Sequence, residues 1–431
     1  MAVHVIDEAN RCLQCKKPMC QQGCPIHTPI PTMIKALKEG GLEEAGAMLF
    51  SNNPMSLVCS LVCNHERQCE GHCVLGRKGQ PVHVSSIENY ISDTCLERID
   101  VRCQPKNGKK VAVIGAGPAG ITIAILLTKK GYSVTIFDSR DKIGGVLQYG
   151  IPEFRLPKTR VVRPEIENVK KLGVKIETDV IIGKSVTIDE LMDEEGFKAV
   201  FIGSGAGLPK FMGIPGENAN GVFSANEYLT RSNLMKAFRD DYDTPIFLGK
   251  KVAVVGGGNV AMDAARTALR LGAEVHVVYR RSEAELPARV EEVHHAKEEG
   301  IIFDLLTNPT EILADEKGWV KGMNVVKMEL GEPDASGRRR PVEVEGSNYT
   351  IDCDTVIMSL GTSPNPLISN TTDGLDVNKH KCIVADEANG QTSREGVFAG
   401  GDAVTGAATV ILAMEAGKAG ARGIHEYLSN K

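Results

Sequence analysis

The hydrophobic pattern divides the chain into a helical first part and a strand-rich remainder. Apolar residues at helical spacing predict one helix over 32–50 and another over 85–98. Residues 1–105 show little strand pattern. A polar, turn-rich segment at 104–110 follows, and it predicts a domain boundary at that point.

Beyond this boundary, two βαβ units open with similar glycine-rich patterns. In the first, a buried strand leads into Gly115-Ala-Gly117-Pro-Ala-Gly120 and then into an apolar helix. In the second, a buried strand leads into Gly256-Gly-Gly258-Asn-Val-Ala and another helix. The two patterns start 141 positions apart, at Gly115 and Gly256, which indicates an internal duplication of one nucleotide-binding unit.

Further apolar runs that end in glycine predict strands at 199–202, 355–360 and 396–399, and a long helix is expected over 407–428. The second unit therefore interrupts the first. The predicted fold class is α/β, with two nested doubly wound (Rossmann-like) nucleotide-binding domains behind an α-helical cysteine-rich domain. The expected boundaries are 1–105 for the helical domain, 106–230 and 355–431 for the first nucleotide domain, and 231–354 for the second.

The length of 431 residues agrees with about three domains. Residues 1–105 carry ten Lys and Arg against eleven Asp and Glu, so a basic nucleic-acid module is excluded. The start of the chain lacks the pattern of a signal peptide, and its apolar stretches are too short to span a bilayer. These features predict a soluble, cytoplasmic protein that binds neither nucleic acid nor membrane.

Cysteines are concentrated in the predicted helical domain. Ten of the twelve lie within the first 103 residues, and eight of these form two runs: Cys12, Cys15, Cys20 and Cys24, then Cys59, Cys63, Cys69 and Cys73. In a reducing cytosol such density favours metal ligands or redox centres over disulfides. Zinc sites prefer two separated cysteine pairs, whereas the first run, which ends in Cys24-Pro25, is closer to an iron–sulfur run. Iron–sulfur clusters are therefore the favoured interpretation.

By the logic of two-cluster ferredoxins, Cys12, Cys15 and Cys20 hold one cluster and Cys24 joins the second. Nearby histidines at 27, 65 and 72 are alternative zinc ligands, and we expect them to be surface groups.

The first glycine pattern has the context of a dinucleotide site, because a strand precedes it and a helix follows. The glycines permit close approach of a pyrophosphate, and the helix N-terminus stabilises its charge. Asp138 ends the next strand, where a carboxylate can bind a ribose hydroxyl. The residues expected at this site are Gly115, Gly117, Pro118, Ala119, Gly120 and Asp138.

The second pattern has no carboxylate at the corresponding position. Tyr279 stands there, followed by Arg280 and Arg281. Arginine accommodates a 2′-phosphate, so these residues favour NADPH over NADH as the nucleotide. The alternative interpretation is that both arginines are solvated surface residues without a role in binding. The residues expected at this second site are Gly256, Gly258, Asn259, Val260, Ala261, Arg280 and Arg281.

Two nucleotide sites without a separate substrate domain suggest hydride transfer between two cofactors, from NADPH to a flavin. This reaction needs no acid or base from the protein, so we predict no catalytic residue. The Gly401-Asp402 turn fits the flavin domain: Asp402 could hold ribityl hydroxyls, and the helix beginning near Thr409 could face the flavin.

The chain resembles the small (beta) subunit family of bacterial NADPH-dependent glutamate synthase. It is also similar to the flavin subunit of NADH-dependent ferredoxin:NADP oxidoreductase and to the amino-terminal half of dihydropyrimidine dehydrogenase. The resemblance covers nearly the whole chain and is carried by six specific stretches besides Gly115–Gly120: Cys12–Pro25, Cys59–Cys73, Gly144–Pro157, Gly256–Asp263, Val278–Pro287 and Gly400–Ala413.

The resemblance implies two [4Fe-4S] clusters. One would use Cys12, Cys15, Cys20 and Cys73, and the other Cys24, Cys63, Cys69 and Glu88. Asn89 is the alternative to Glu88, because the spacing of this ligand from Cys73 varies within the family. Ser85-Ser86 also departs from the family's usual pair near Glu88. Cys59 would then be a spare cysteine.

The resemblance also places FAD in the first site, with Gly145, Val146 and Leu147 passing by the isoalloxazine. Asp138 stands where the family usually has Glu, and Val146 replaces a usual Leu.

The function implied is hydride transfer from NADPH to FAD, followed by single-electron transfer through the clusters to a partner. The favoured partner is the larger, FMN-containing subunit of glutamate synthase, in L-glutamate biosynthesis, which makes the chain part of a hetero-oligomer. The alternatives are an electron-input role in dihydropyrimidine dehydrogenase or in a bifurcating ferredoxin:NADP oxidoreductase. A disulfide reductase would need a CxxC beside the flavin, and only Cys353 and Cys382 lie beyond Cys103. The non-enzymatic alternative is a scaffold subunit that is stabilised by zinc and has degenerate nucleotide sites.

Overall fold

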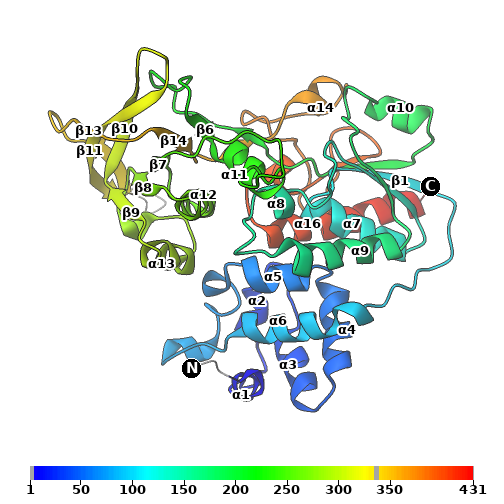
Figure 1. The fold of residues 1–431 in the computed structure, drawn as a ribbon. Helices are drawn as coiled ribbons and strands as arrows, with labels where there is room; N and C mark the ends of the chain where they lie inside the picture. Colours follow the sequence, from blue (N-terminus) through cyan, green and yellow to red (C-terminus); the bar gives the residue numbers. More distant parts are fainter. Residues whose placement is uncertain (1–3, 334–338, 431) are drawn as a thin grey trace. The chain divides into compact units, whose positions relative to one another are not determined.

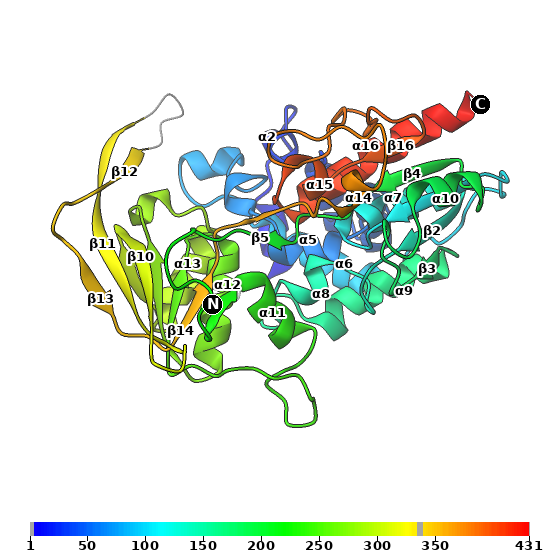
Figure 2. The ribbon, with the colours of Figure 1, turned by 90° about the horizontal axis from the view of Figure 1, so that it is seen from above.

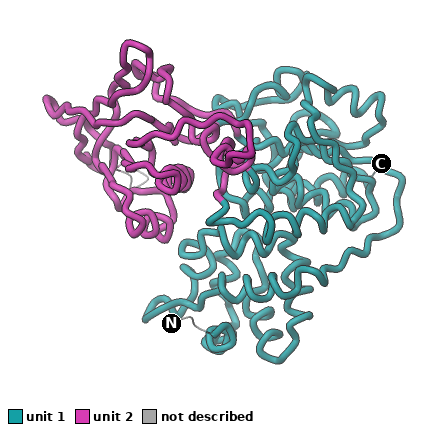
Figure 3. Tube along the Cα trace, in the orientation of Figure 1, with its two compact units in different colours: residues 1–148, 153–206, 363–431 teal, residues 149–152, 207–362 magenta. Residues whose placement is uncertain are grey.

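The computed structural model describes residues 4–333 and 339–430 (Figure 1). Two compact units are present (Figure 3). The first unit comprises Met1–Gln148, Glu153–Ala206 and Ser363–Lys431, and the second comprises Tyr149–Pro152 and Gly207–Thr362. Each unit is described by itself.

The first unit begins with a set of short helices around one apolar core, in which Met33, Ile34, Leu49, Ile87 and Ile91 are almost fully buried. The helix predicted over 32–50 is two helices, because the chain turns at Gly40 with a positive φ of 84°. The elements are α1 (Val5–Asn10), α2 (Met19–Gln22), α3 (Ile30–Lys38), α4 (Leu42–Asn52), α5 (Ser56–Val62), η1 (His65–Arg67), η2 (Val74–Arg77), α6 (Val84–Cys95) and η3 (Leu96–Arg98).

A five-stranded parallel sheet forms the rest of the first unit, in the order β16-β4-β1-β2-β3. Its strands are β1 (Lys110–Ile114), β2 (Ser133–Phe137), β3 (Lys175–Glu177), β4 (Ala199–Ile202) and β16 (Val397–Ala399). The buried helix α7 (Pro118–Lys129) packs against α16 (Val410–Ser429), as Figure 2 shows. Residues 111–129 and 397–429, far apart in sequence, therefore share one core.

Shorter elements complete this unit: α8 (Val146–Tyr149), the π-helix η4 (Lys158–Val162), α9 (Arg163–Lys171), α10 (Ile188–Asp193), α14 (Leu367–Asn370) and α15 (Asp402–Thr405). The two-residue strand β5 (Leu208–Pro209) belongs to the second unit, and β15 (Thr362–Ser363) lies at the boundary between the two units along the chain.

The second unit contains another five-stranded parallel sheet, in the order β6-β14-β7-β8-β9. Its strands are β6 (Val222–Ser224), β7 (Lys251–Val255), β8 (Glu274–Tyr279), β9 (Ile302–Leu305) and β14 (Thr355–Met358). The accompanying helices are α11 (Ala225–Asn233), α12 (Asn259–Arg270), η5 (Glu283–Glu285) and α13 (Val290–Glu298). An antiparallel sheet adds β10 (Thr307–Ala314), β11 (Val320–Pro333), β12 (Arg339–Glu343) and β13 (Tyr349–Ile351).

The predicted fold class is thus confirmed: a helical domain precedes two nucleotide-binding sheets. One strand differs from the expectation, since β14 pairs with β6 and β7 of the second sheet instead of returning to the first. A strand buried on both faces has the same sequence pattern in either sheet, so the pattern alone could not assign it. The domain boundaries given above otherwise stay a prediction.

Arg339 and Arg340 lie in strand β12. Glu292 of α13 is buried and forms an ion pair with Arg266 at 2.6 Å. Within 4–333 and 339–430, no helix combines the length and apolar character needed to cross a membrane.

Candidate functional site

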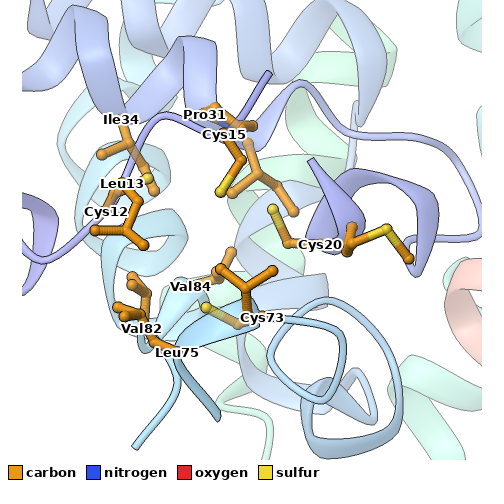
Figure 4. Close-up of a pocket in the computed structure, with 13 residues that line it drawn as sticks. Cys12, Leu13, Cys15, Cys20, Pro31, Ile34, Cys73, Leu75, Val82 and Val84 are labelled. Atoms are coloured by element: carbon orange, nitrogen blue, oxygen red, sulfur yellow. The ribbon is translucent and has the colours of Figure 1, made fainter. Parts of the chain in front are cut away.

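The first of two cysteine-lined cavities lies in the helical part. Cys12, Cys15, Cys20 and Cys73 surround it, as Figure 4 shows, although sixty residues separate the first from the last. Gln14 has a φ of +50°, and this turn lets Cys12 and Cys15 face the same space. The remaining lining is mainly apolar side chains: Leu13, Met19, Ile30, Pro31, Ile34, Val74, Leu75, Val82 and Val84.

Two thiols of this cavity, those of Cys12 and Cys20, are costly to ionise without a cation. Burial raises the pKa of Cys12 and raises that of Cys20 to about 11, and the neighbouring cysteines add to both shifts. Four sulfurs in an apolar pocket fit a metal cluster, because bound metal stabilises the thiolate form and offsets this cost.

The second cavity is lined by Cys24, Cys63, Cys69 and Glu88. Glu88 projects from α6, and its Oε1 accepts a hydrogen bond from the Asn53 amide at 3.3 Å. Asn89, the alternative ligand, donates instead to the Ser60 hydroxyl and is not part of the lining. The structure therefore brings together both proposed sets of four donors, each around its own cavity.

Burial dominates the electrostatics of the second cavity as well. It raises the pKa of Glu88 to about 8, partly opposed by the Asn53 hydrogen bond. The pKa of the Cys63 thiol is raised well above its usual value by the Cys59 hydrogen bond and by burial. The Cys24 thiol donates to the Thr28 hydroxyl at 3.3 Å.

Two residues of the second cavity were not among the predicted ligands. Cys59, expected to be spare, lines the cavity beside Asn53. His65, expected at the surface, is only 4% exposed and also lines it. Its position between Cys63 and Cys69 in the second run was the available signal. In the described ranges, no three His, Cys, Asp or Glu side chains are arranged to hold a single metal ion.

The first glycine pattern forms a tight turn between β1 and α7. A Cβ on Gly120 would stand 1.9 Å from the Gly115 carbonyl oxygen, so only glycine fits there. A Cβ on Gly117 would meet no atom within 4 Å, and Gly117 caps the N-terminus of α7. This open space at a helix N-terminus, with Pro118 and Ala119 in the first turn, fits a pyrophosphate. Asp138 is buried, and its carboxylate accepts from the Ala116 N–H at 2.7 Å.

The other predicted flavin residues lie against this turn. Gly145 approaches Gly117 so closely that a Cβ on it would be 2.8 Å from the Gly117 Cα. Leu147 is buried, whereas Val146 is 36% exposed. A Cβ on Gly401 would contact Ala119 of α7.

Asp402 and Thr409 also flank the start of α16. Burial raises the pKa of Asp402 to about 6, and its carboxylate accepts from the Ala408 N–H. The Thr409 hydroxyl caps α16 by accepting from the Leu412 N–H.

The second glycine pattern repeats this geometry in the second unit. A Cβ on Gly256 would stand 2.3 Å from the Ser359 carbonyl oxygen, whereas Gly258, at the N-terminus of α12, has open space. Asn259 accepts from the Arg289 N–H at 2.9 Å. In the same turn Val260 is exposed and Ala261 is buried.

The two arginines after β8 differ in their surroundings. Arg280 is exposed, and Arg281 is half-buried. The Nε of Arg281 is buried without a hydrogen-bond partner among the described residues. Such a donor fits an anionic group such as a 2′-phosphate.

Relatives with high sequence similarity span nearly the whole chain. It is 39% identical over 435 residues to the putative oxidoreductase AegA of Escherichia coli, 40% identical to the NADP(+)-dependent formate dehydrogenase subunit beta of Moorella thermoacetica, and 37% identical to the glutamate synthase [NADPH] small chain of E. coli. The matches cover 98%, 95% and 98% of this chain. They cover 66% and 60% of the first two relatives but 91% of the third.

Solved structures share the fold of the nucleotide-binding part. Mycobacterium tuberculosis FprA in complex with NADPH is 18% identical, with a TM-score of 0.64, and the match covers 76% of this chain and 85% of FprA. Thioredoxin reductase of T. acidophilum is 21% identical, with a TM-score of 0.55, over 75% of this chain and 99% of that protein.

Two family models divide the sequence between them. Residues 2–99 match the dihydropyrimidine dehydrogenase domain II family, which carries a 4Fe-4S cluster, and residues 109–417 match the pyridine nucleotide-disulphide oxidoreductase family. The chain belongs to the NAD(P)H-dependent flavin oxidoreductases of the glutamate synthase small-chain type, in which a [4Fe-4S] domain precedes an FAD- and NAD(P)H-binding domain.

Proposed function

We propose that this protein takes electrons from NADPH and delivers them singly, by way of FAD and two [4Fe-4S] clusters, to a larger partner subunit. The favoured partner is the FMN-containing subunit of glutamate synthase. One observation carries the proposal: two separate cavities in the helical part are each lined by four candidate ligands.

The proposed ligand sets give each cavity one cluster. Cys12, Cys15, Cys20 and Cys73 would hold the first, and Cys24, Cys63, Cys69 and Glu88 the second. Glu88 as an oxygen ligand would give the second cluster a different electronic environment from the first. Ligand type and burial are the means by which proteins set cluster potentials.

The first unit also joins the second cavity to the proposed flavin site. Ile411, in the first turn of α16, lines the cavity beside Cys59 and Glu88. Thr409 caps the same helix end, which we place against the flavin. The Lys418 ammonium of α16 donates to the Asn52 carbonyl oxygen at 3.1 Å, which ties this helix to the end of α4. These contacts fix α16 against the helical part.

Bound FAD would supply the conversion from a two-electron hydride to single electrons. The protein's own residues bind and orient: Gly117 and the N-terminus of α7 would receive the pyrophosphate, and Asp138 a ribose hydroxyl. Arg280 and Arg281 would select NADPH through its 2′-phosphate. No side chain is needed to move a proton.

The relatives of this chain belong to different enzymes, so the share of each relative that the match covers is used to choose among the partners. The match to the E. coli glutamate synthase small chain covers 91% of that protein, which favours glutamate synthase. Relatives named as beta subunits of formate dehydrogenase and of NADPH-Fe(3+) oxidoreductase are matched over 60% and 63% of their lengths. Pyrimidine reduction and flavin-based bifurcation remain the alternative roles.

The test is anaerobic affinity purification from the native host, with mass identification of every chain that co-purifies. Recovery of a large glutaminase-containing subunit, with about eight iron atoms per small chain, supports the proposal. Recovery of a pyrimidine reductase or a ferredoxin-reducing flavoprotein moves the assignment to that complex. A chain that purifies alone contradicts the proposed partner.

A further inference from the structure

Charge is unevenly distributed along the helical part. The segments 9–38 and 71–87 together contain seven Lys and Arg residues and no Asp or Glu. The rest of the first 105 residues contains three Lys and Arg and all eleven Asp and Glu. A nearly neutral domain therefore carries its positive charge in two particular stretches.

Those two stretches supply all the cysteines of the first cavity. Arg11 forms an ion pair with Glu8 at 2.6 Å, and Lys35 forms one with Glu39 at 3.8 Å. Five further cations are exposed, and the described residues include no ion pair for them: Lys16, Lys17, Lys38, Arg77 and Lys78. Lys16 directly follows Cys15, and Arg77 and Lys78 follow the cavity residue Leu75.

The first cavity, whose lining includes sequence neighbours of these cations, is partly open and apolar. Leu13 is one of the apolar residues that line this cavity, and its side chain is 61% exposed. Cys12, Cys15, Cys20 and Cys73 are each partly exposed. By contrast, Cys24, Cys63 and Cys69 of the second cavity are buried. Because electron transfer between proteins weakens steeply with distance, the first cavity is the one from which electrons can leave.

We propose that Leu13, Lys16, Lys17, Arg77 and Lys78 form a docking face, here called the basic face, for an electron-accepting protein whose redox centre lies under an acidic surface. This inference rests on the proposed function. NADPH supplies two electrons and releases one proton to solvent, and two partner centres in turn each gain one electron. Complementary charge speeds encounter and sets orientation.

An anionic membrane is the other class of partner that could attract these cations. The partly exposed cysteine residues next to these cations favour a protein, because a lipid surface accepts no electrons. Dependence on the charge of the partner would distinguish specific docking at this face from non-specific binding. Acidic acceptor proteins should bind, and basic ones should not.

The test uses two proteins of opposite charge with the full-length holoprotein. Binding of acidic plastocyanin in its redox-silent cadmium form, and of basic cytochrome c, is measured by calorimetry at several salt concentrations. We expect plastocyanin alone to bind, with an affinity that falls as salt rises. The variant K16E/K17E/R77E/K78E should lose at least tenfold of this affinity and gain binding of cytochrome c.

A matched control variant is K379E/K381E, which reverses two exposed lysines of the first unit that lie outside the helical part. It should bind both proteins as the wild type does. Equal binding of plastocyanin by wild type and K16E/K17E/R77E/K78E would overturn the docking face. So would strong binding to phosphatidylglycerol vesicles without any binding of plastocyanin.

Failure of the underlying function has a separate signature. Anaerobic NADPH should bleach the iron–sulfur absorbance in wild type and in both charge variants alike. Loss of bleaching in the wild type refutes the proposed function, whereas normal bleaching with unchanged plastocyanin binding refutes the basic face alone.

Discussion

The carboxylate of Glu165, in α9, caps helix α5 of the helical part: its Oε1 accepts from the Leu57 N–H at 3.0 Å. The Val58 N–H lies at 3.4 Å from the same oxygen. Glu165 is 5% exposed, and its Oε2 has no hydrogen-bond partner among the described residues. Burial raises the pKa of Glu165 to about 8, which favours a protonated carboxyl at neutral pH. A single side chain thus positions the helix that leads into the second cavity.

The pKa of Glu165 makes stability depend on pH. Its folded pKa of about 8 exceeds the ordinary value of 4.5, so the folded state holds the proton more tightly. The resulting stabilisation is fully present below pH 4.5, declines as pH rises and is lost above pH 8. In Glu165→Gln this loss is absent, while Oε1 still accepts from Leu57 and Val58.

Thermal unfolding of the holoprotein at pH 6 and pH 8.5 checks this expectation. Between pH 6 and pH 8.5, the midpoint temperature of unfolding should fall further in the wild type than in Glu165→Gln. Glu88, whose charge also raises the pKa of Glu165, would be a cluster ligand in both holoproteins, so the comparison isolates the titration of Glu165. Equal losses would show that Glu165 does not titrate as its burial implies.

The two cavities predict separate effects of cysteine substitutions. Cys73→Ser should remove the first cluster and Cys69→Ser the second, so each lowers iron from about eight to about four atoms per chain. Cys59→Ser should keep about eight, because Cys59 is not in either proposed ligand set. Iron assay and low-temperature electron paramagnetic resonance of the reduced proteins distinguish these cases. Iron loss in Cys59→Ser would make Cys59 a ligand.

Two glycines in one turn should respond differently to alanine. Gly120→Ala forces a Cβ to 1.9 Å from the Gly115 carbonyl oxygen, so we expect a loss of stability of about 1–3 kcal/mol or more. Gly117→Ala meets open space and should fold normally. Its methyl group would occupy the proposed pyrophosphate position, so FAD affinity should fall about tenfold or more. Unfolding curves and flavin titration of the deflavinated protein measure the two effects, and normal FAD affinity in Gly117→Ala would move the pyrophosphate elsewhere.

Arg281 is expected to recognise the 2′-phosphate of NADPH. Arg281→Ala should raise the KM for NADPH by about 10- to 100-fold, the usual cost of losing a hydrogen bond to a charged group. The KM for NADH should stay unchanged, since NADH lacks that phosphate. Steady-state reduction of a dye with each nucleotide gives both constants. Lys317→Ala, at an exposed position of the same unit, is the control. A parallel rise for NADH would indicate a structural role for Arg281.

The local pattern of the sequence determined the elements and the chemistry. Three features are local in the sequence: the two strand–glycine–helix units, the density of cysteines in the first 103 residues and the arginines after β8. Short-range sterics and ligand chemistry are enough to interpret them. The helical start and the two nucleotide-binding sheets were therefore predictable. The break between α3 and α4 was missed although Gly40-Gly41 is a dipeptide typical of turns, because the apolar positions on both sides of it continue the helical spacing.

Tertiary structure decided which distant residues meet. The family resemblance had already grouped Cys73 with Cys12 and named Glu88, and the fold brings these residues to the two cavities while leaving Asn89 outside. The fold alone puts β14 in the second sheet, because packing of buried faces selects among partners that look equivalent along the chain. The cap that Glu165 places on α5 has no sequence signature, since the burial of Glu165 is a property of the whole fold. For His65, the position between Cys63 and Cys69 was the one sequence signal, and only the fold shows that the side chain is buried. The two basic segments, residues 9–38 and 71–87, likewise meet only in the fold, because both contribute residues to the lining of the first cavity.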